Sequence, residues 1–228
     1  MDESFTPYVR DGLIGQRDGD FGDGLYRNSL YSVLANDKAH WELTKKHCEV
    51  SPGIWVRHPD PNRWYSSPTN CSRDQVAKAM LAAAYFKDTS TIKRWLKEQA
   101  KRGFWHQNNR VYNDTTKWKV PDIMAPNEWA NVIRGLNIKL LYPVVMFLDL
   151  FLLGDLYFRT KNTWDYDSLL AINIWYANEV MSNPISKLCV YLYKKTDYND
   201  RILYNFCRTE NDICPLGKMY VEFLKEKL

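Results

Sequence analysis

The spacing of hydrophobic residues predicts helices along most of the chain. In the first of them, hydrophobic residues recur at intervals of about one helical turn: Leu25, Leu30, Val33 and Leu34. Similar patterns cover residues 73–86, 89–102 and 126–136, and others follow at 169–181, 184–194, 199–207 and 215–228. No segment shows sustained alternation of hydrophobic and polar residues, the pattern of a half-buried strand, and only a short extended piece is expected, at 54–57. The sequence therefore predicts an all-α protein.

Short motifs mark where two of these helices begin and end. Ser72 and Gln75 form a capping box, in which each side chain bonds the other residue's backbone N–H group, so a helix is expected to start at Arg73. The next helix is expected to start at Thr89 and to end at Gly103. Because the connection between them is very short, the two helices should form an αα-hairpin.

Irregular polar stretches precede three of the predicted helices. They lie at 11–23, 52–71 and 104–125, and the second contains four prolines, which cannot continue a helix. Long loops in compact domains are usually functional or disordered, and the tryptophans of the second loop argue against disorder. The three helix starts are expected to share one rim of the molecule.

Composition indicates one domain that spans residues 1–228. Hydrophobic residues make up 45% of the chain, enough for a sizeable core, and aromatic residues make up 14%. We expect the site loops mainly within 11–128 and mostly structural helices within 129–228. The five cysteines form no CxxC pair, which favours reduced, buried thiols in a cytoplasmic protein. The N-terminus has no signal-peptide pattern.

One apolar stretch has the length of a membrane span. Residues 140–158 contain Asp149 and Asp155, and each central Asp costs about 2.5–3.5 kcal/mol on insertion. We therefore expect a buried core helix here and no membrane partner.

Charge is distributed unevenly along the chain. The first 25 residues are acidic, whereas residues 87–119 are rich in Lys and Arg. The basic helix at 93–102, followed by Phe104 and Trp105, has the composition of a nucleic-acid-binding surface. A helix face that is simply exposed to solvent explains the lysines equally well. The acidic residues among the first 25 also argue against a continuous basic surface. Nucleic acid is therefore disfavoured as a partner.

The Asp/Gly-rich opening raises the question of calcium. The positions of its acidic residues do not fit an EF-hand, which needs Gly at position six and Glu at position twelve of the loop. A calcium site of another kind, formed by Asp18, Asp20 and Asp23, stays open beside turn and capping roles for the same residues. The histidines lack the spacing of metal ligands, and no other metal or cofactor site is predicted.

The loops before the helices carry most residues that could perform chemistry. Helix N-termini favour anions, and a His beside a carboxylate can act as a general acid or base. The candidate acid/base residues are Asp20, Asp23, Asp74 and His58. The candidate clamps for acidic sugars are Arg27, Arg57 and Arg73. Structural roles for some of these residues remain open. His58 can equally be a hydrogen-bonded loop residue, and Arg73 and Asp74 can be an ordinary charge pair in the first turn of the helix.

Three short segments carry a resemblance: DGDFGDGLYR at 18–27, GIWVRHP at 53–59 and SRDQ at 72–75. Through them, over about residues 11–136, the chain resembles uncharacterised all-helical proteins of bacteria and their phages. Those proteins look like (α/α)-toroid carbohydrate-active enzymes, in which helical hairpins form a ring and loops at one end build a sugar cleft. The chain is too short for a six-hairpin ring, so we expect a partial toroid with long irregular loops on one rim.

The resemblance implies glycan hydrolysis or lyase chemistry, with Trp55, Trp64 and Trp105 as stacking platforms for sugar rings. The sequence thus favours a carbohydrate-active protein, a glycoside hydrolase or polysaccharide lyase, with a polysaccharide partner in a Trp-rimmed cleft. The alternative is a non-catalytic structural or host-interaction protein of a bacterium or phage. A phage-encoded chain would be associated with the virion or released.

Overall fold

The computed structural model describes most of the first 141 residues. The described residues are 9–15, 21–71, 73–103, 126–141, 144, 216, 218, 219, 222, 223 and 226, without the side chains of 69, 73, 74 and 126–130. The chain divides into two compact units, Met1–Leu136 and Asn137–Leu228. The second contains few described residues, so the prediction of a single domain stays a prediction.

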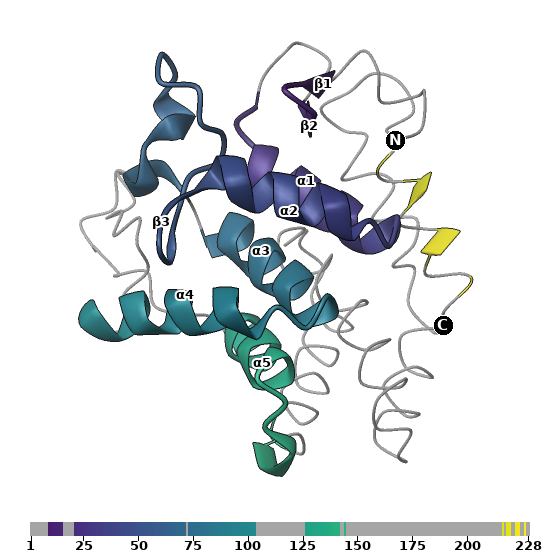
Figure 1. Ribbon diagram of the computed structural model, residues 1–228, viewed down its shortest axis with the longest axis vertical. Coiled ribbons are helices and arrows are strands. Elements are labelled where there is room, and N and C mark those ends of the chain that lie inside the picture. Colours follow the sequence, from purple (N-terminus) through teal and green to yellow (C-terminus); the bar gives the residue numbers. More distant parts are fainter. Residues whose placement is uncertain are drawn as a thin grey trace, which may run out of the picture. The chain divides into compact units, whose positions relative to one another are not determined.

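Five helices form the framework of the first unit (Figure 1). They are α1 (Gly24–Leu34), α2 (Lys38–Cys48), α3 (Arg73–Tyr85), α4 (Thr89–Lys101) and α5 (Pro126–Gly135). The predicted starts of α1, α3, α4 and α5 agree with the structure to within one residue. Asp88 caps α4, since its side chain accepts the N–H of Thr91, and Gly103 follows the end of α4 with φ of 63°.

Two small antiparallel sheets correct the all-α prediction, although the described part is mostly helical. Strands β1 (Val9–Arg10) and β2 (Leu13–Ile14) pair with each other, as do β3 (Glu49–Ser51) and β4 (Ile54–Trp55). The turn between β1 and β2 consists of Asp11 and Gly12, both with positive φ, as a tight hairpin requires. Strands this short hold too few residues to show an alternating pattern.

Helix α3 packs between α1 and α5, and α5 follows the direction of α3, because Asn131 bonds the Ala77 carbonyl and Gly135 lies against Ala84. Helix α1 runs in the same direction as α3. At their starts, the N–H of Tyr26 in α1 bonds Gln75 in α3. Near their ends, the hydroxyl of Tyr85 in α3 lies 3.3 Å from Oδ1 of Asn36, just beyond α1. Helices α2 and α4 each follow one of these helices after a short turn. The αα-hairpin predicted for α3 and α4 is confirmed.

Small residues let these helices approach closely. The alanines of α3 are buried, including Ala79, Ala82 and Ala83, each fully. A Cβ atom added to Gly135 in α5 would collide with Ile92 of α4 and come within 3.4 Å of Ala84. The tight packing that the Ala-rich sequence of α3 predicts is therefore present.

Most of the second unit lies outside the described residues. The stretch 140–158 and the helices expected at 169–181, 184–194 and 199–207 fall there, whereas the described residues between 216 and 226 are helical, as expected. Near the start of this unit, Leu140 and Val144 are exposed. Within the described residues, no helix combines the length and the apolar character that a membrane span needs.

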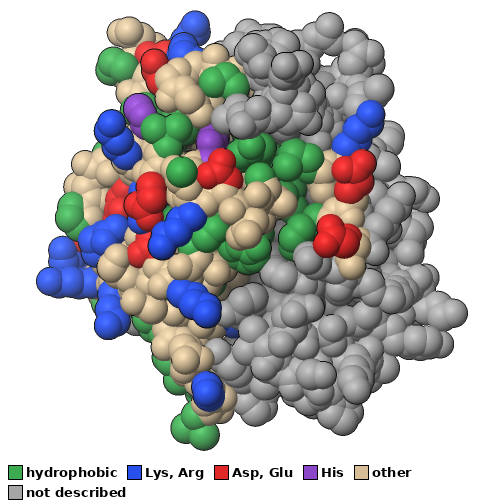
Figure 2. Space-filling model, turned by 45° about the vertical axis from the view of Figure 1, so that its right-hand side comes forward, with side chains coloured by type: hydrophobic (Ala, Val, Ile, Leu, Met, Phe, Trp, Pro, Cys, Tyr) green, Lys and Arg blue, Asp and Glu red, His purple; other side chains and the backbone are tan. Residues whose placement is uncertain are grey.

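Ion pairs offset much of the positive charge of α4. Arg94 pairs with Glu49 of β3 at 2.6 Å, and both Lys101 and Arg102 pair with Glu98. Figure 2 shows basic and acidic side chains interspersed over the described part of one face of the molecule. The uneven charge of the sequence therefore produces no continuous basic band on the described part of that face.

A buried polar cluster joins β2, α1 and α2. The Asn28 side chain pairs with both backbone groups of Ile14, accepting from its N–H at 2.8 Å and donating to its carbonyl at 2.9 Å. His40 of α2 lies 2.8 Å from the same Asn28 oxygen through Nε2, so this nitrogen carries the proton. Burial lowers the pKa of His40 to about 4. His40 is thus a neutral donor in the core.

The neutral state of His40 makes stability depend on pH. Its pKa is lower in the folded chain than the ordinary value of 6.5, so its contribution is fully present above pH 6.5 and is lost as the pH falls toward 4. We expect His40→Gln to reduce the loss of unfolding free energy between neutral and acid pH by about 2–3 kcal/mol. Urea unfolding at a series of pH values measures this. His47→Gln, on the same helix but not buried, is the control, and an equal effect of the two variants would contradict the assignment to the burial of His40.

Candidate functional site

The starts of α1 and α3 are joined by side-chain hydrogen bonds. Gln75 accepts the backbone N–H of Tyr26 at 2.9 Å through Oε1 and donates to Oδ1 of Asp23 at 2.9 Å through Nε2. Gln75 is fully buried, whereas 28% of the Asp23 side chain is exposed. The predicted convergence of these two helix starts is confirmed, and it places a partly exposed carboxylate at the junction.

Arg57 ties the proline-rich loop to this junction. Its guanidinium donates to the carbonyl oxygens of Asn70 at 2.6 Å and Gly22 at 2.7 Å, and Nη1 lies 3.4 Å from Oδ1 of Asp23. The backbone also approaches closely, because a Cβ atom added to Gly24 would lie 2.6 Å from the Arg57 carbonyl oxygen. Arg57 therefore holds both ends of the loop against the start of α1.

The loop is braced along its length and presents one large aromatic side chain. Successive turns run from Asp60 to Cys71 and include two 3-10 helices, η2 (Trp64–Ser66) and η3 (Pro68–Asn70). The Asn70 amide donates to the Trp64 carbonyl at 2.6 Å. The Trp64 side chain is 53% exposed, and the Arg57 guanidinium carbon lies 5.1 Å from the centre of its ring. Trp64 thus lies on a fixed backbone and is accessible, which a stacking platform requires.

His58 is buried and hydrogen-bonded within its loop, which agrees with the structural role left open for it and speaks against the acid/base role. Its side chain is 1% exposed and packs on Phe21, with the ring centroids 4.3 Å apart. Nδ1 accepts the N–H of Asp60 at 3.2 Å, so Nε2 carries the proton, and within the described structure this buried nitrogen has no hydrogen-bond partner. Burial, assisted by the charge of Arg10, lowers the pKa of His58 to about 4. A covered, neutral ring cannot serve as an acid or base for a substrate at neutral pH.

Arg10 and Asp60 belong to the same region, although the sequence did not identify Arg10. The Arg10 guanidinium donates to Oδ2 of Asp60 at 3.1 Å and lies 4.4 Å above the Phe21 ring centre. The backbone N–H of Asn62 and then Arg10 lower the pKa of Asp60. A sequence signal existed, because the Asp11-Gly12 pair predicts the hairpin turn that places Arg10.

Two other predicted binding residues lie in the interior. Trp55 is fully buried on β4 and stacks on Trp41 of α2 at a centroid distance of 6.1 Å. It is a core residue, and its role as a sugar platform is not supported. Arg27 in α1 is 8% exposed, so it is poorly placed to clamp a ligand at the surface.

The remaining candidates fall outside what the structure describes. Asp18, Asp20 and Trp105 lie outside the described residues, as do the side chains of Arg73 and Asp74. Among the described residues, no group of three or more His, Cys, Asp or Glu could hold a metal ion. Because two of the three acidic residues of the calcium hypothesis are not described, that hypothesis stays a prediction.

The described cysteines are buried and unbridged. Cys48 and Cys71 are free thiols, and burial raises the pKa of Cys48 to about 12. A thiol with so high a pKa is a poor nucleophile. The prediction of reduced, buried thiols is confirmed for these two residues.

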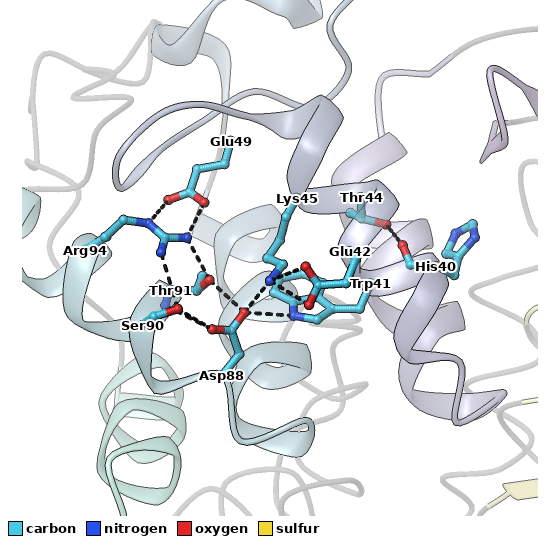
Figure 3. Close-up of polar contacts among 10 residues, drawn as sticks. All are labelled: His40, Trp41, Glu42, Thr44, Lys45, Glu49, Asp88, Ser90, Thr91 and Arg94. Atoms are coloured by element: carbon cyan, nitrogen blue, oxygen red, sulfur yellow. Dashed lines mark hydrogen bonds and ion pairs between the residues drawn. The ribbon is translucent and has the colours of Figure 1, made fainter.

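A second polar cluster connects α2 to the start of α4 (Figure 3). Asp88 accepts from Lys45 at 2.6 Å, from the Thr91 hydroxyl at 2.8 Å and from the Trp41 indole at 3.3 Å. Burial acts to raise the pKa of Asp88, but hydrogen bonds from Lys45, Ser90 and Thr91 hold it well below its usual range. Both Asp88 oxygens have donors within the protein, so we interpret this cluster as a structural clamp.

The clamp predicts a loss of stability when Asp88 is replaced. Asp88→Ala removes the cap of α4 and leaves the largely buried Lys45 without this partner, so it should lower the unfolding free energy by about 2–3 kcal/mol in urea titrations. Glu42→Ala is the control, because Glu42 pairs with the same lysine but is 54% exposed. It should cost less than about 0.5 kcal/mol. Equal losses for the two variants would contradict the assignment.

The junction of α1 and α3 predicts a second effect. Gln75→Glu replaces the donor that faces Asp23 with a carboxylate of the same shape, so we expect the unfolding free energy at pH 7 to fall by about 2 kcal/mol. Protonation removes the repulsion, so the deficit should shrink toward about pH 4.5. Urea unfolding at both pH values measures this. Asn62→Asp, an exposed change of the same kind, should have little effect, and a deficit that does not depend on pH would refute the repulsion.

No protein-family model, curated protein or solved structure matches the chain. A function for this protein is therefore argued from the site itself.

Proposed function

We propose that this protein is carbohydrate-active and binds a glycan at the loop between β4 and α3, with Trp64 as the stacking platform. The observation that carries the proposal is the exposure of Trp64, at 53%, on a loop whose backbone is fixed by successive turns. A large apolar side chain in water is unfavourable, and a fixed one forms a flat surface ready for a ligand. The apolar face of a sugar ring is complementary to such a surface.

Polar groups beside Trp64 suit the hydroxyl groups of a sugar. Arg57 lies against the indole ring, and Asp23 is within 3.4 Å of Arg57. A carboxylate accepts hydrogen bonds and a guanidinium donates them, so the pair offers both functions that a hydroxyl group uses. Binding sites commonly combine an aromatic surface with a few fixed polar groups that set orientation.

The arrangement of the helices is compatible with a partial (α/α) toroid. Helix α3 packs on both α1 and α5, and the residues in contact show that the three share one direction. Helices α2 and α4 each follow one of them after a short turn. Inner helices that share a direction bring their N-terminal loops to one rim. The hydrogen bonds between Gln75 and the start of α1 support such a rim for two of the three helices.

Glycoside hydrolase or polysaccharide lyase activity is the catalytic form of this proposal. Asp23 would act with Asp20 or Asp74, because hydrolysis of a glycosidic bond commonly uses two carboxyl groups about 5–9.5 Å apart. Asp23 accepts from Gln75 and Arg57, which suits a carboxylate that remains charged. Release of reducing sugars or of unsaturated products from polysaccharides distinguishes hydrolysis from elimination.

Replacing Trp64 tests the proposal. We expect Trp64→Ala to weaken glycan binding about tenfold or more, because a sugar that covers about 60 Å² of the indole gains about 1.5 kcal/mol. Trp64→Phe should retain part of the affinity. A glycan array identifies the ligand, and calorimetry measures its dissociation constant for each variant.

Val50→Ala is the matched control, since Val50 is exposed to a similar extent, 51%, but lies on β3. It should bind as the wild-type chain does. Unchanged binding by a folded Trp64→Ala variant, or no glycan binding by the wild-type chain, would overturn the proposal.

A further inference from the structure

We infer that His58 is an acid-sensitive latch: its neutral ring holds the β1–β2 hairpin against the loop between β4 and α3, and protonation of the ring releases the hairpin. The ring contacts three parts of the chain. Phe21, just before α1, packs on it at 4.3 Å between ring centroids, Tyr65 of η2 lies edge-on at 5.9 Å, and Arg10 of β1 reaches Nδ1. The latch does not depend on what the loop binds, so it stands apart from the proposed function.

Nδ1 of His58 faces two hydrogen-bond donors. The backbone N–H of Asp60 lies 3.2 Å from it, and Nη2 of Arg10 lies 3.4 Å from it. A backbone N–H group and a guanidinium can only donate, so Nδ1 must accept and cannot carry a proton in this arrangement. The neutral ring satisfies both donors at one nitrogen.

The other ring nitrogen gives a charged ring no support. Nε2 of His58 is buried, and no atom of the described residues accepts a hydrogen bond from it. A charged ring would therefore direct one N–H at two donors and leave the other N–H buried without an acceptor, which costs free energy at both nitrogens. Protonation thus favours a form in which the latch is open.

The charges around the ring oppose protonation on balance. Among the described residues, Arg10 of β1 and, more weakly, His47 of α2 disfavour a positive charge on His58. Asp60 in the loop and Asp11 in the hairpin turn favour one, but Asp60 already accepts from Arg10 at 3.1 Å. Burial and then Arg10 outweigh the two carboxylates, so the pKa of His58 falls to about 4 in the closed form.

Opening at His58 can stay local, because other bonds hold the ends of the loop. Arg57 donates to the carbonyl oxygens of Gly22 and Asn70, and Gln75 accepts from the start of α1. His58 takes part in none of these bonds. Acid should therefore free the hairpin and the middle of the loop while α1 and α3 stay joined.

The pH range of the latch follows from the two pKa values of His58. The ordinary value is 6.5, which applies to the open form, and the closed form has a value of about 4. The closed form is therefore fully favoured above pH 6.5. As the pH falls from 6.5 toward 4, each unit should raise the population of the open form about tenfold.

Hydrogen exchange of backbone amides, followed by NMR on the full chain at pH values from 7 to 4.5, tests the latch. The amide of Asp60 reports on opening, because it bonds Nδ1 directly. After correction for the intrinsic exchange rate, its protection should fall about tenfold per pH unit below pH 6.5. Protection that does not change with pH would overturn the inference.

The amide of Ala83, which is fully buried in α3, separates local opening from unfolding of the whole chain. Local opening disrupts fewer contacts than unfolding does, so Asp60 should be protected at least about tenfold less than Ala83 at every pH. Equal protection of the two amides would mean that the hairpin is released only when the whole chain unfolds, and the local latch would be wrong.

Replacing the ring tests the role of His58 itself. In His58→Asn, the side-chain oxygen lies near the position of Nδ1, so it can accept the N–H of Asp60 but does not titrate. We expect protection of the Asp60 amide to lose its dependence on pH. A dependence that persists in this variant would show that another group is responsible.

A second variant keeps the ring in place, so it remains informative if His58→Asn does not fold. Arg10→Met removes the cation beside Nδ1, which should raise the pKa of His58 in the closed form and make the total fall in protection at least about threefold smaller. An unchanged fall would overturn the part assigned to Arg10. His47→Gln is the control, since His47 has the weakest influence on His58. It should behave as the wild-type chain, and an equal effect of this variant would contradict the assignment.

Discussion

The hydrogen bonds of Gln75 are the constraint on which the site depends. One buried amide satisfies a backbone donor at the start of α1 and positions Asp23, so it fixes where two helices and a carboxylate lie. Arg57 then attaches the proline-rich loop to the same point. Because both residues bond backbone groups as well as side chains, the loop, the helix starts and the exposed Trp64 form one connected structure.

Residues with structural roles differ from candidate binding residues in how far their side chains are bonded within the protein. Asp88, Asn28 and His40 are surrounded by donors and acceptors of the protein, and such saturated groups hold helices together. Trp64 differs, since its side chain is exposed on a loop that is otherwise well bonded. A fixed backbone with accessible side chains is typical of a surface that binds a ligand.

Much of the helical framework follows from local rules. The starts of α1, α3, α4 and α5 were predicted from spacing, capping residues and prolines, because these signals act within a few residues. Of the two hairpins, only the extended piece at 54–57 was predicted, where β4 lies, because two or three residues are too few to alternate. The Asp11-Gly12 pair is a sequence signal for the turn between β1 and β2. The structure confirms this turn, because both residues have positive φ.

The sequence by itself determined the helices, the polar loops and the residue types available for chemistry. It could not determine burial, because aromatic and ionisable side chains occur both inside proteins and on their surfaces. Tertiary packing placed Trp55 against Trp41 and covered His58 with Phe21, whereas it left Trp64 in solvent. It also decided which charges are paired around the loop, since Arg10 and Asp60 are fifty residues apart and meet only when the chain folds.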